Sequence, residues 1–157
     1  MAWRVFAEQM FTADYSGSPT HSAKAVMDYD LALKAVRTWV VMFNSPVFTQ
    51  LQMRIYSNSG GYPLDLLHTF TKTWTLAEIT SQPYAVREIY FDTTNAFPLI
   101  GGETYHFVLW ATGYTGTASS HIGWVRTLDD PPYPGFTPEM TDLGIAPFRI
   151  TYIGAKA

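Results

Sequence analysis

Four histidines are the first residues in this sequence that could do chemistry, since imidazole binds metals and serves as a general acid or base. His21, His68, His106 and His121 lie far apart, with no His-x-His or His-x-x-x-His pair among them. A metal centre would need about four side chains from separate places to converge in the fold. We therefore expect no metal site, and we interpret the histidines as exposed or hydrogen-bonded strand residues.

Two pairs of aspartates are the next candidates. Asp28 and Asp30 would share one face of a strand, and Asp129 and Asp130 are neighbours in a predicted loop. Paired carboxylates bind calcium or act as acid and base, but no Asp-x-Asp-x-Asp-Gly pattern surrounds either pair. We expect solvated face and turn residues. Asp28 with Asp30 is the one place where a calcium ion would be sought.

Nucleophilic catalysis finds no support in the sequence. The chain has no cysteine and no Gly-x-Ser-x-Gly elbow. Its glycine-rich pieces, Ser59-Gly60-Gly61 and Gly101-Gly102, lie between predicted strands and not at the start of a helix, where a phosphate-binding loop would be found. We expect no catalytic residue, no cofactor and no enzymatic activity.

Aromatic residues, 16% of the chain, are the remaining feature. A sandwich buries one face of each strand, so an aromatic residue on the other face must be exposed, covered by a loop or placed in an interface. Exposed aromatic rings bind sugars and also anchor subunits. Our candidates for an interface or glycan contact are Tyr114, Trp124 and Tyr133. For each of them taken singly we favour core or self-packing, and Trp124→Ala is the substitution that would test sugar binding.

Alternating hydrophobic and polar residues predict the strands that position these side chains. The residues that this alternation assigns to buried faces are Val47, Leu51, Met53, Ile55, Ile89, Phe91, Tyr105, Phe107 and Leu109. It assigns Arg54 and Trp110, among others, to the opposite faces of their strands. A closing strand is predicted around Phe148, Ile150 and Tyr152.

The segment from Ser22 to Phe43 admits two interpretations. Its hydrophobic residues also recur at helical spacing, and Ala, Leu and Lys favour helices. The β-rich ending 37–43 runs straight into Asn44-Ser45-Pro46, which argues against a helix. We predict two strands with a bend near Asp28 to Asp30, and a helix stays open as the alternative.

Turn residues separate the strands at intervals typical of a sandwich. The segment of about 129–144 contains four prolines and is predicted to be an extended loop of the kind that often serves an interface. No repeat or linker divides the chain. We predict one domain over 1–157, an all-β, two-sheet antiparallel jelly-roll sandwich of about eight strands, with an N-terminal arm of about 1–21.

Charge and hydropathy exclude several classes of partner. The net charge is -3, and the ten Lys and Arg residues are spread singly, unlike the clustered basic surface that a nucleic acid requires. The start, Met-Ala-Trp-Arg-Val-Phe, lacks the basic and apolar regions of a signal peptide, and no stretch approaches the roughly 18 apolar residues of a membrane span. We expect a protein that is made without export and contacts neither nucleic acid nor membrane.

Several segments between residues 34 and 126 resemble a jelly-roll module of bacterial surface proteins and phage virion proteins. A strand ending in Ile55-Tyr56-Ser57 is followed by a Gly-Pro loop and by Leu66-Leu67. The aromatic strand Ile89-Tyr90-Phe91, the turn from Leu99 to Tyr105 and the strand Phe107-Val108-Leu109 follow in the same order. These are structural motifs, and the resemblance carries no catalytic residue with it.

The resemblance implies a non-enzymatic virion structural protein, of the capsid-decoration (cement) or tail-accessory kind, assembled in the host cytoplasm. Its expected partners are the major capsid protein or tail subunits and other copies of itself, with a trimer as the implied oligomer. The alternative is a carbohydrate-binding module that recognises a cell-surface or environmental polysaccharide. A glycan array separates the two classes.

Overall fold

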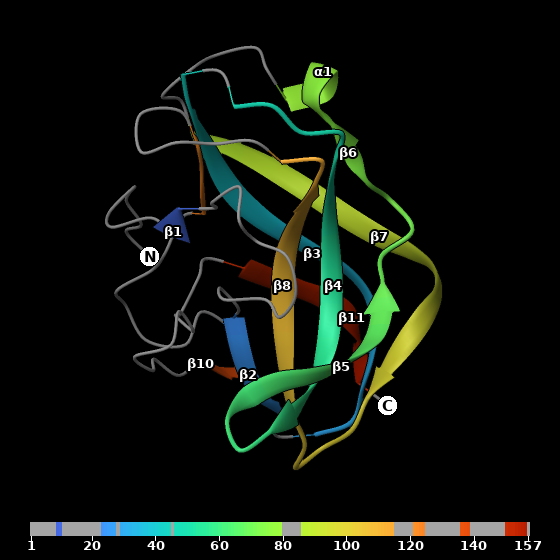
Figure 1. The fold of residues 1–157 in the computed structure, drawn as a ribbon. Helices are drawn as coiled ribbons and strands as arrows, with labels where there is room; N and C mark the ends of the chain where they lie inside the picture. Colours follow the sequence, from blue (N-terminus) through green and yellow to red (C-terminus); the bar gives the residue numbers. More distant parts are fainter. Residues whose placement is uncertain are drawn as a thin grey trace.

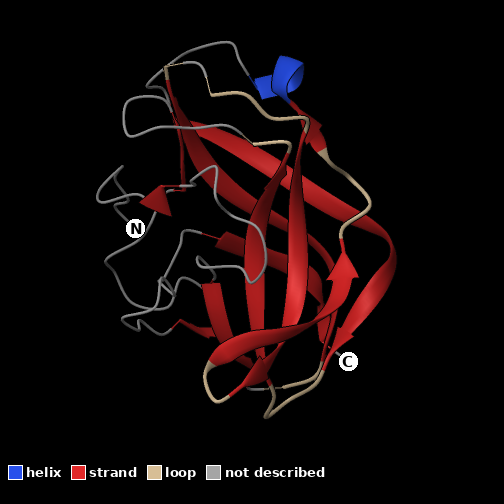
Figure 2. Cartoon of the chain, viewed as in Figure 1, coloured by secondary structure: helices blue, strands red, loops and turns tan. Residues whose placement is uncertain are grey.

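In the computed structural model, the described residues are 9–10, 23–27, 29–44, 46–79, 86–114, 121–124, 136–138 and 150–156. Figure 2 shows that most of this part is strand, with loops and one short helix. In chain order its elements are β1 (Gln9–Met10), β2 (Ala23–Met27), β3 (Leu31–Phe43), β4 (Gln50–Ser59), β5 (Tyr62–Thr69), β6 (Trp74–Thr75), α1 (Leu76–Ile79), β7 (Val86–Leu99), β8 (Thr104–Thr112), β9 (His121–Trp124), β10 (Phe136–Pro138) and β11 (Ile150–Lys156).

These strands form two antiparallel sheets, which confirms the predicted all-β sandwich. In sheet 1, β3 pairs with β7, β9 and β11, and β9 also pairs with β1. Sheet 2 has the order β10-β2-β8-β4-β5, with β6 pairing β4. Figure 1 shows the two layers, with β3, β7 and β11 behind β4 and β8. The chain crosses between the sheets from β2 to β3 and again from β3 to β4, as in Greek-key and jelly-roll sandwiches.

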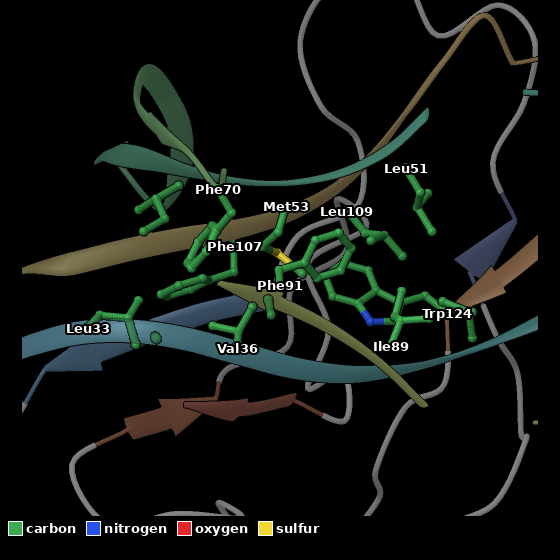
Figure 3. Close-up of a cluster of buried hydrophobic side chains, with 14 of the residues drawn as sticks. Leu33, Val36, Leu51, Met53, Phe70, Ile89, Phe91, Phe107, Leu109 and Trp124 are labelled. Carbon is green, nitrogen blue, oxygen red and sulfur yellow. The ribbon is translucent and has the colours of Figure 1, made fainter. Parts of the chain in front are cut away.

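The core lies between the two layers and is built from one face of each sheet. Leu33 and Val36 of β3 face Met53 of β4 and Phe107 of β8, and Phe91 of β7 fills the space between them (Figure 3). All five are fully buried, at 0% exposure. Burial of side chains of this size contributes about 1.5–3 kcal/mol each. The alternation over β4, β7 and β8 therefore predicted the core faces correctly.

The bend predicted near Asp28 to Asp30 is present, and the helical alternative for residues 22–43 is wrong. Residues 23–27 form β2 in sheet 2, whereas 31–43 form β3 in sheet 1. In β2 the buried residues alternate, as they do in a half-buried strand. The hydrophobic residues of two separate strands, which belong to different sheets, happen to recur at helical spacing when the segment is taken as one.

Val47 was assigned to the wrong face. Its side chain is 56% exposed, and its neighbour Phe48 is buried instead. Strand β4 begins only at Gln50, so the alternation that includes Leu51 does not extend back to Val47. The N-terminal arm and the proline-rich segment lie largely outside the described residues, but each contributes a short strand, β1 paired with β9 and β10 paired with β2.

Strands β4 and β5 form a tight hairpin with two glycines at its tip. Ser59 pairs with Tyr62, so Gly60 and Gly61 alone make the turn. Their φ angles of 59° and 91° match a turn with two positive-φ residues, whose twist suits a hairpin. The glycine-rich segment predicted as a turn is therefore a two-residue hairpin turn, after which β5 begins at Tyr62.

Hydrogen bonds join the two sheets along one edge, where the chain after β5 meets β7. The backbone N–H of Lys72 donates to the carbonyl of Asp92 at 3.1 Å. The indole N–H of Trp74 donates to the carbonyl of Tyr90 at 2.7 Å. These contacts cover part of the edge of β7 and fix the position of β5 relative to sheet 1.

Candidate binding surfaces

Four side chains of β4 form a hydrogen-bonded row in sheet 2, of which Gln50, Gln52 and Arg54 are half-buried and Tyr56 is buried. Gln52 Nε2 donates to Gln50 Oε1 at 3.4 Å. Arg54 donates from Nε to Gln52 Oε1 at 3.1 Å and from Nη1 to the Tyr56 hydroxyl at 3.3 Å. Successive members are two residues apart, so they lie on one face of the strand. Each side chain holds the next, which positions the row before any ligand arrives.

Trp110 of β8 lies beside this row. It is directly opposite Gln52 in the pairing of β4 with β8. The Arg54 guanidinium carbon lies 4.5 Å from the centroid of the Trp110 ring, a cation–π contact. Trp110 as a whole residue is half-buried. We call Gln50, Gln52, Arg54, Tyr56 and Trp110 the Arg54 surface.

A buried histidine, His106, lies beside Tyr56 at one end of the Arg54 surface. His106 is opposite Tyr56 in the same strand pairing and is fully buried. Its Nε2 lies 2.9 Å from Asn58 Oδ1. A buried imidazole that is hydrogen-bonded stiffens the sheet at this position. His106 therefore has a structural role at the border of the surface.

Strand β5 exposes three leucines. The exposed fractions are 60% for Leu64, 49% for Leu66 and 42% for Leu67. The pairing of β4 with β5 is irregular here, since Tyr56 is opposite Leu66 while Ile55 is opposite His68. Leu67 is thus an extra residue on β5, and leucines emerge on both sides of the strand. We call Leu64, Leu66 and Leu67 the leucine edge, because β5 ends the strand order of sheet 2.

Two of the three predicted contact residues, Trp124 and Tyr114, lie in the described part of the structure. Trp124 is buried at 0% exposure, and its indole N–H donates to Thr38 Oγ1 at 2.6 Å. It packs among the side chains of both sheets (Figure 3). A ring in that position cannot stack on a sugar at the surface of the folded domain. Trp124 is therefore a core residue, as the sequence favoured for each of these aromatics taken singly.

Tyr114 is half-buried beside the core and holds β9. Its hydroxyl accepts the backbone N–H of Ile122 at 3.2 Å. Burial raises the pKa of the Tyr114 hydroxyl, and the bond from Ile122 opposes that shift. Tyr133 lies outside the described residues. The structure thus brings neither Trp124 nor Tyr114 onto the Arg54 surface.

Histidine and aspartate take structural roles where they are described. His68 Nε2 lies 2.8 Å from Thr93 Oγ1, and its ring stacks on Phe97 with centroids 5.0 Å apart. Desolvation lowers the pKa of His68 below its ordinary value. Asp30 accepts the backbone N–H of Gly101 at 2.7 Å, so it stabilises a turn. Over the described ranges, no three His, Asp or Glu side chains are grouped so that they could hold a metal ion.

Outside the Arg54 surface, a short charged cluster begins helix α1. Glu78 accepts the Thr75 backbone N–H at 2.9 Å and binds Lys72 Nζ at 3.0 Å. These hydrogen bonds, that from the Thr75 backbone first, lower the pKa of the Glu78 carboxyl to about 2. This Thr-x-x-Glu arrangement is a capping box and explains why a helix starts here.

Alternation along β4 and β8 places Arg54 and Trp110 on outward faces but does not predict that they are neighbours. They are far apart in the sequence, and only the pairing of β4 with β8 makes them neighbours. The available signal was that both residues interrupt hydrophobic strands on the polar side. The pairing partner of each strand is not encoded in that alternation.

In the described part of the chain, no helix has the length and hydropathy needed to cross a bilayer. Comparisons of the sequence with protein-family models and with curated proteins, and of the fold with solved structures, give no match.

Proposed function

We propose that the protein is a non-enzymatic structural protein of a bacteriophage virion, of the capsid-decoration or tail-accessory kind. The leucine edge is the observation that carries this proposal. Three exposed leucines on one edge strand are unusual for a protein that acts alone, because edges of this type favour association with other chains. A virion subunit that covers Leu64, Leu66 and Leu67 would remove this liability.

The arrangement of β5 suits a protein partner. Its last residue pairs back onto β4, and the chain that follows is hydrogen-bonded to β7. The apolar edge is therefore held at a fixed place on the molecule. A fixed apolar strand binds a partner with little loss of conformational entropy. The resemblance of 34–126 to virion modules supports the same class, with the major capsid protein or a tail subunit as the partner.

Rebinding to particles tests the proposal. Mass spectrometry of purified particles should detect the protein, and recombinant protein should bind particles that lack it. The double variant Leu64→Ser/Leu66→Ser should lose most of this binding, because burying each leucine in the interface would contribute about 1.5–3 kcal/mol to the free energy of binding.

Matched controls are available on the same molecule. Val47 and Ile100 are each 56% exposed and lie outside β5. Val47→Ser and Ile100→Ser should leave particle binding unchanged. Absence of the protein from particles, or equal loss of binding in control and leucine variants, would refute the proposal.

The Arg54 surface favours a second candidate function, which is carbohydrate binding. A half-buried tryptophan beside a row of amide side chains combines an aromatic ring with donors and acceptors for hydroxyl groups. The test is a glycan array with the wild-type chain and with Trp110→Ala. Trp110 replaces Trp124 in this test, because removal of a core indole would unfold the domain. Binding that is retained by Trp110→Ala would exclude this surface.

A further inference from the structure

Strand β5 exposes four consecutive residues, and one of them is an acid. Leu64, Asp65, Leu66 and Leu67 are all exposed. In Figure 1, β5 turns away from the direction of β4 and runs towards β7, at the end of the strand order of sheet 2. Asp65 therefore lies within the leucine edge, with an exposed leucine on either side of it in the chain.

The pairing with β4 keeps Asp65 beside Leu64. Two residues of β5, Leu64 and Asp65, are opposite the single residue Ser57 of β4. The Ser57 hydroxyl accepts the backbone N–H of Asp65 at 3.0 Å, which holds this bulge in place. A partner that covers Leu64 therefore also comes close to the Asp65 carboxylate.

The Asp65 carboxylate makes no hydrogen bond or ion pair with any residue in the described ranges. Asp92 and Glu103 are also exposed and lack such side-chain contacts there. Neither has exposed apolar neighbours, because Asp92 lies between the buried residues Phe91 and Thr93, and Glu103 follows two glycines in a turn. Asp65 is therefore the acid that a partner of the leucine edge would remove from water.

The backbone of β5 is poorly suited to the addition of a further strand. Pro63 has no N–H to donate, and the two bulges, at Leu64–Asp65 and at Leu67, interrupt the row of backbone groups. A partner therefore contacts the side chains of the leucine edge. Such a contact excludes water from the leucines and from the carboxylate among them.

We propose that the leucine edge docks on an apolar surface of a virion protein that places a Lys or Arg side chain on the Asp65 carboxylate. This inference rests on the proposed function and adds the chemistry of the partner. A carboxylate that loses water without gaining a cation or hydrogen bonds opposes association. Asp65 thus selects among apolar surfaces, and a charge pair enclosed by leucines is screened little by salt.

A second leucine edge cannot supply this cation, because β5 contains no Lys or Arg between Tyr62 and Thr69. Contact between the leucine edges of two copies leaves both Asp65 carboxylates without a cation from the other edge. Such a contact is therefore weaker than the contact with the virion partner. The same acid that favours the partner also limits association of the free protein.

The direction in which Asp65→Asn changes particle binding tests the inference, because asparagine keeps the size of the side chain and removes its charge. The probe is particles that lack the protein, and binding is measured by co-sedimentation over a range of concentrations. If the partner provides a cation, Asp65→Asn should weaken binding about tenfold or more, and Asp65→Lys should weaken it further. If the partner surface is uncharged, Asp65→Asn should bind more tightly, since no charge is desolvated.

Glu103→Gln is the matched control variant. It removes the same charge from an exposed site outside β5, so it should leave particle binding unchanged. Sedimentation of the isolated variants is the second measurement. Asp65→Asn should increase association between copies while it decreases binding to particles, and a misfolded variant would lose both. Thermal unfolding of each variant shows whether the fold is intact.

The possible failures are distinguishable. Unchanged or tighter particle binding of Asp65→Asn would refute the cation on the partner, and loss of binding in Leu64→Ser/Leu66→Ser would still support the proposed function. An equal loss in Glu103→Gln would show an effect of net charge and would refute the pairing. Wild-type protein that binds no particles would refute the proposed function and this inference with it.

Discussion

At the scale of single residues, a hydrogen bond to Thr38 allows the Trp124 indole to be buried with its N–H group paired. Both side chains are at 0% exposure, and the indole N–H donates to the Thr38 hydroxyl at 2.6 Å. A buried donor without an acceptor costs free energy, because it gave up its bonds to water. The need for an acceptor for the Trp124 indole therefore explains why the polar residue Thr38 occupies an inward position of β3.

Thr38→Val should lower the free energy of unfolding by about 1–3 kcal/mol, because the variant keeps the shape of the side chain and removes the acceptor. Urea denaturation measures the change. In the double variant Thr38→Val/Trp124→Phe both polar groups are gone, so the two losses should not add. Strict additivity would show that the hydrogen bond contributes nothing.

His68 should make the stability of the sandwich depend on pH. Its pKa is lowered in the folded state by desolvation beside Phe97, while in the unfolded chain it has the ordinary value of 6.5. Below that value the unfolded chain takes up a proton that the folded domain resists. The stability contributed by neutral His68 is thus complete above pH 6.5 and is lost as the pH falls towards the folded pKa.

Denaturation of wild type and of His68→Gln from pH 8 to 5 checks this expectation. Glutamine can still bond to Thr93 but does not titrate in this range. The free energy of unfolding should fall more steeply with acid in the wild type than in the variant. Parallel curves for the two proteins would contradict the assignment.

At the scale of elements, the sequence predicted strand faces better than strand partners. The alternation in β4, β7 and β8 identified the buried residues, because a residue's face depends only on its place in its own strand. The Arg54 surface depends on which strands pair, and β4 and β8 are brought together by the rest of the fold. Trp124 was one of the candidate contact residues, but it is buried, as is Ile122 two residues before it.

Strand β7 contains an irregularity that the sequence did not suggest. Leu33 pairs with Phe97, whereas Ala35 pairs with Asp92, so the segment 93–96 of β7 is opposite Lys34 alone. The Lys34 ammonium donates to the carbonyls of Thr93 and Thr94, at 2.6 Å each. These carbonyls have lost their regular partners in the sheet. The lysine therefore replaces strand hydrogen bonds with charge-assisted ones.

Lys34→Met should destabilise the domain by about 1–3 kcal/mol, because it leaves both carbonyls without the ammonium while keeping the aliphatic stem. Hydrogen exchange should increase at 93–96 more than in β4. Lys72→Met is the control, since Lys72 bonds to an exposed glutamate. Equal effects of the two substitutions would show that the bulge does not need Lys34.

At the scale of the whole molecule, the two candidate surfaces differ in physical character. The Arg54 surface is polar and charged, so screening by salt should weaken its binding. The leucine edge is apolar, and association through it should persist in salt. Ionic strength therefore distinguishes which surface is in use in any binding experiment.

If the proposed function holds, the isolated protein should self-associate through the leucine edge. Sedimentation of the wild type should show a mass that increases with concentration, with a trimer as the expected limit. Leu64→Ser/Leu66→Ser should sediment as a monomer with unchanged secondary structure. A wild type that remains monomeric at all concentrations would contradict this expectation.

Strand β3 also sets the order of events during synthesis. It is the centre of sheet 1, yet its partners β7, β9 and β11 all follow it, and β11 is on the order of a hundred residues further along the chain. On the ribosome, a hydrophobic strand of 13 residues must therefore wait for its last partner. During this interval it is open to aggregation and to chaperones. Slow translation between Leu99 and Ile150 would lengthen that exposure and reduce the yield of folded protein.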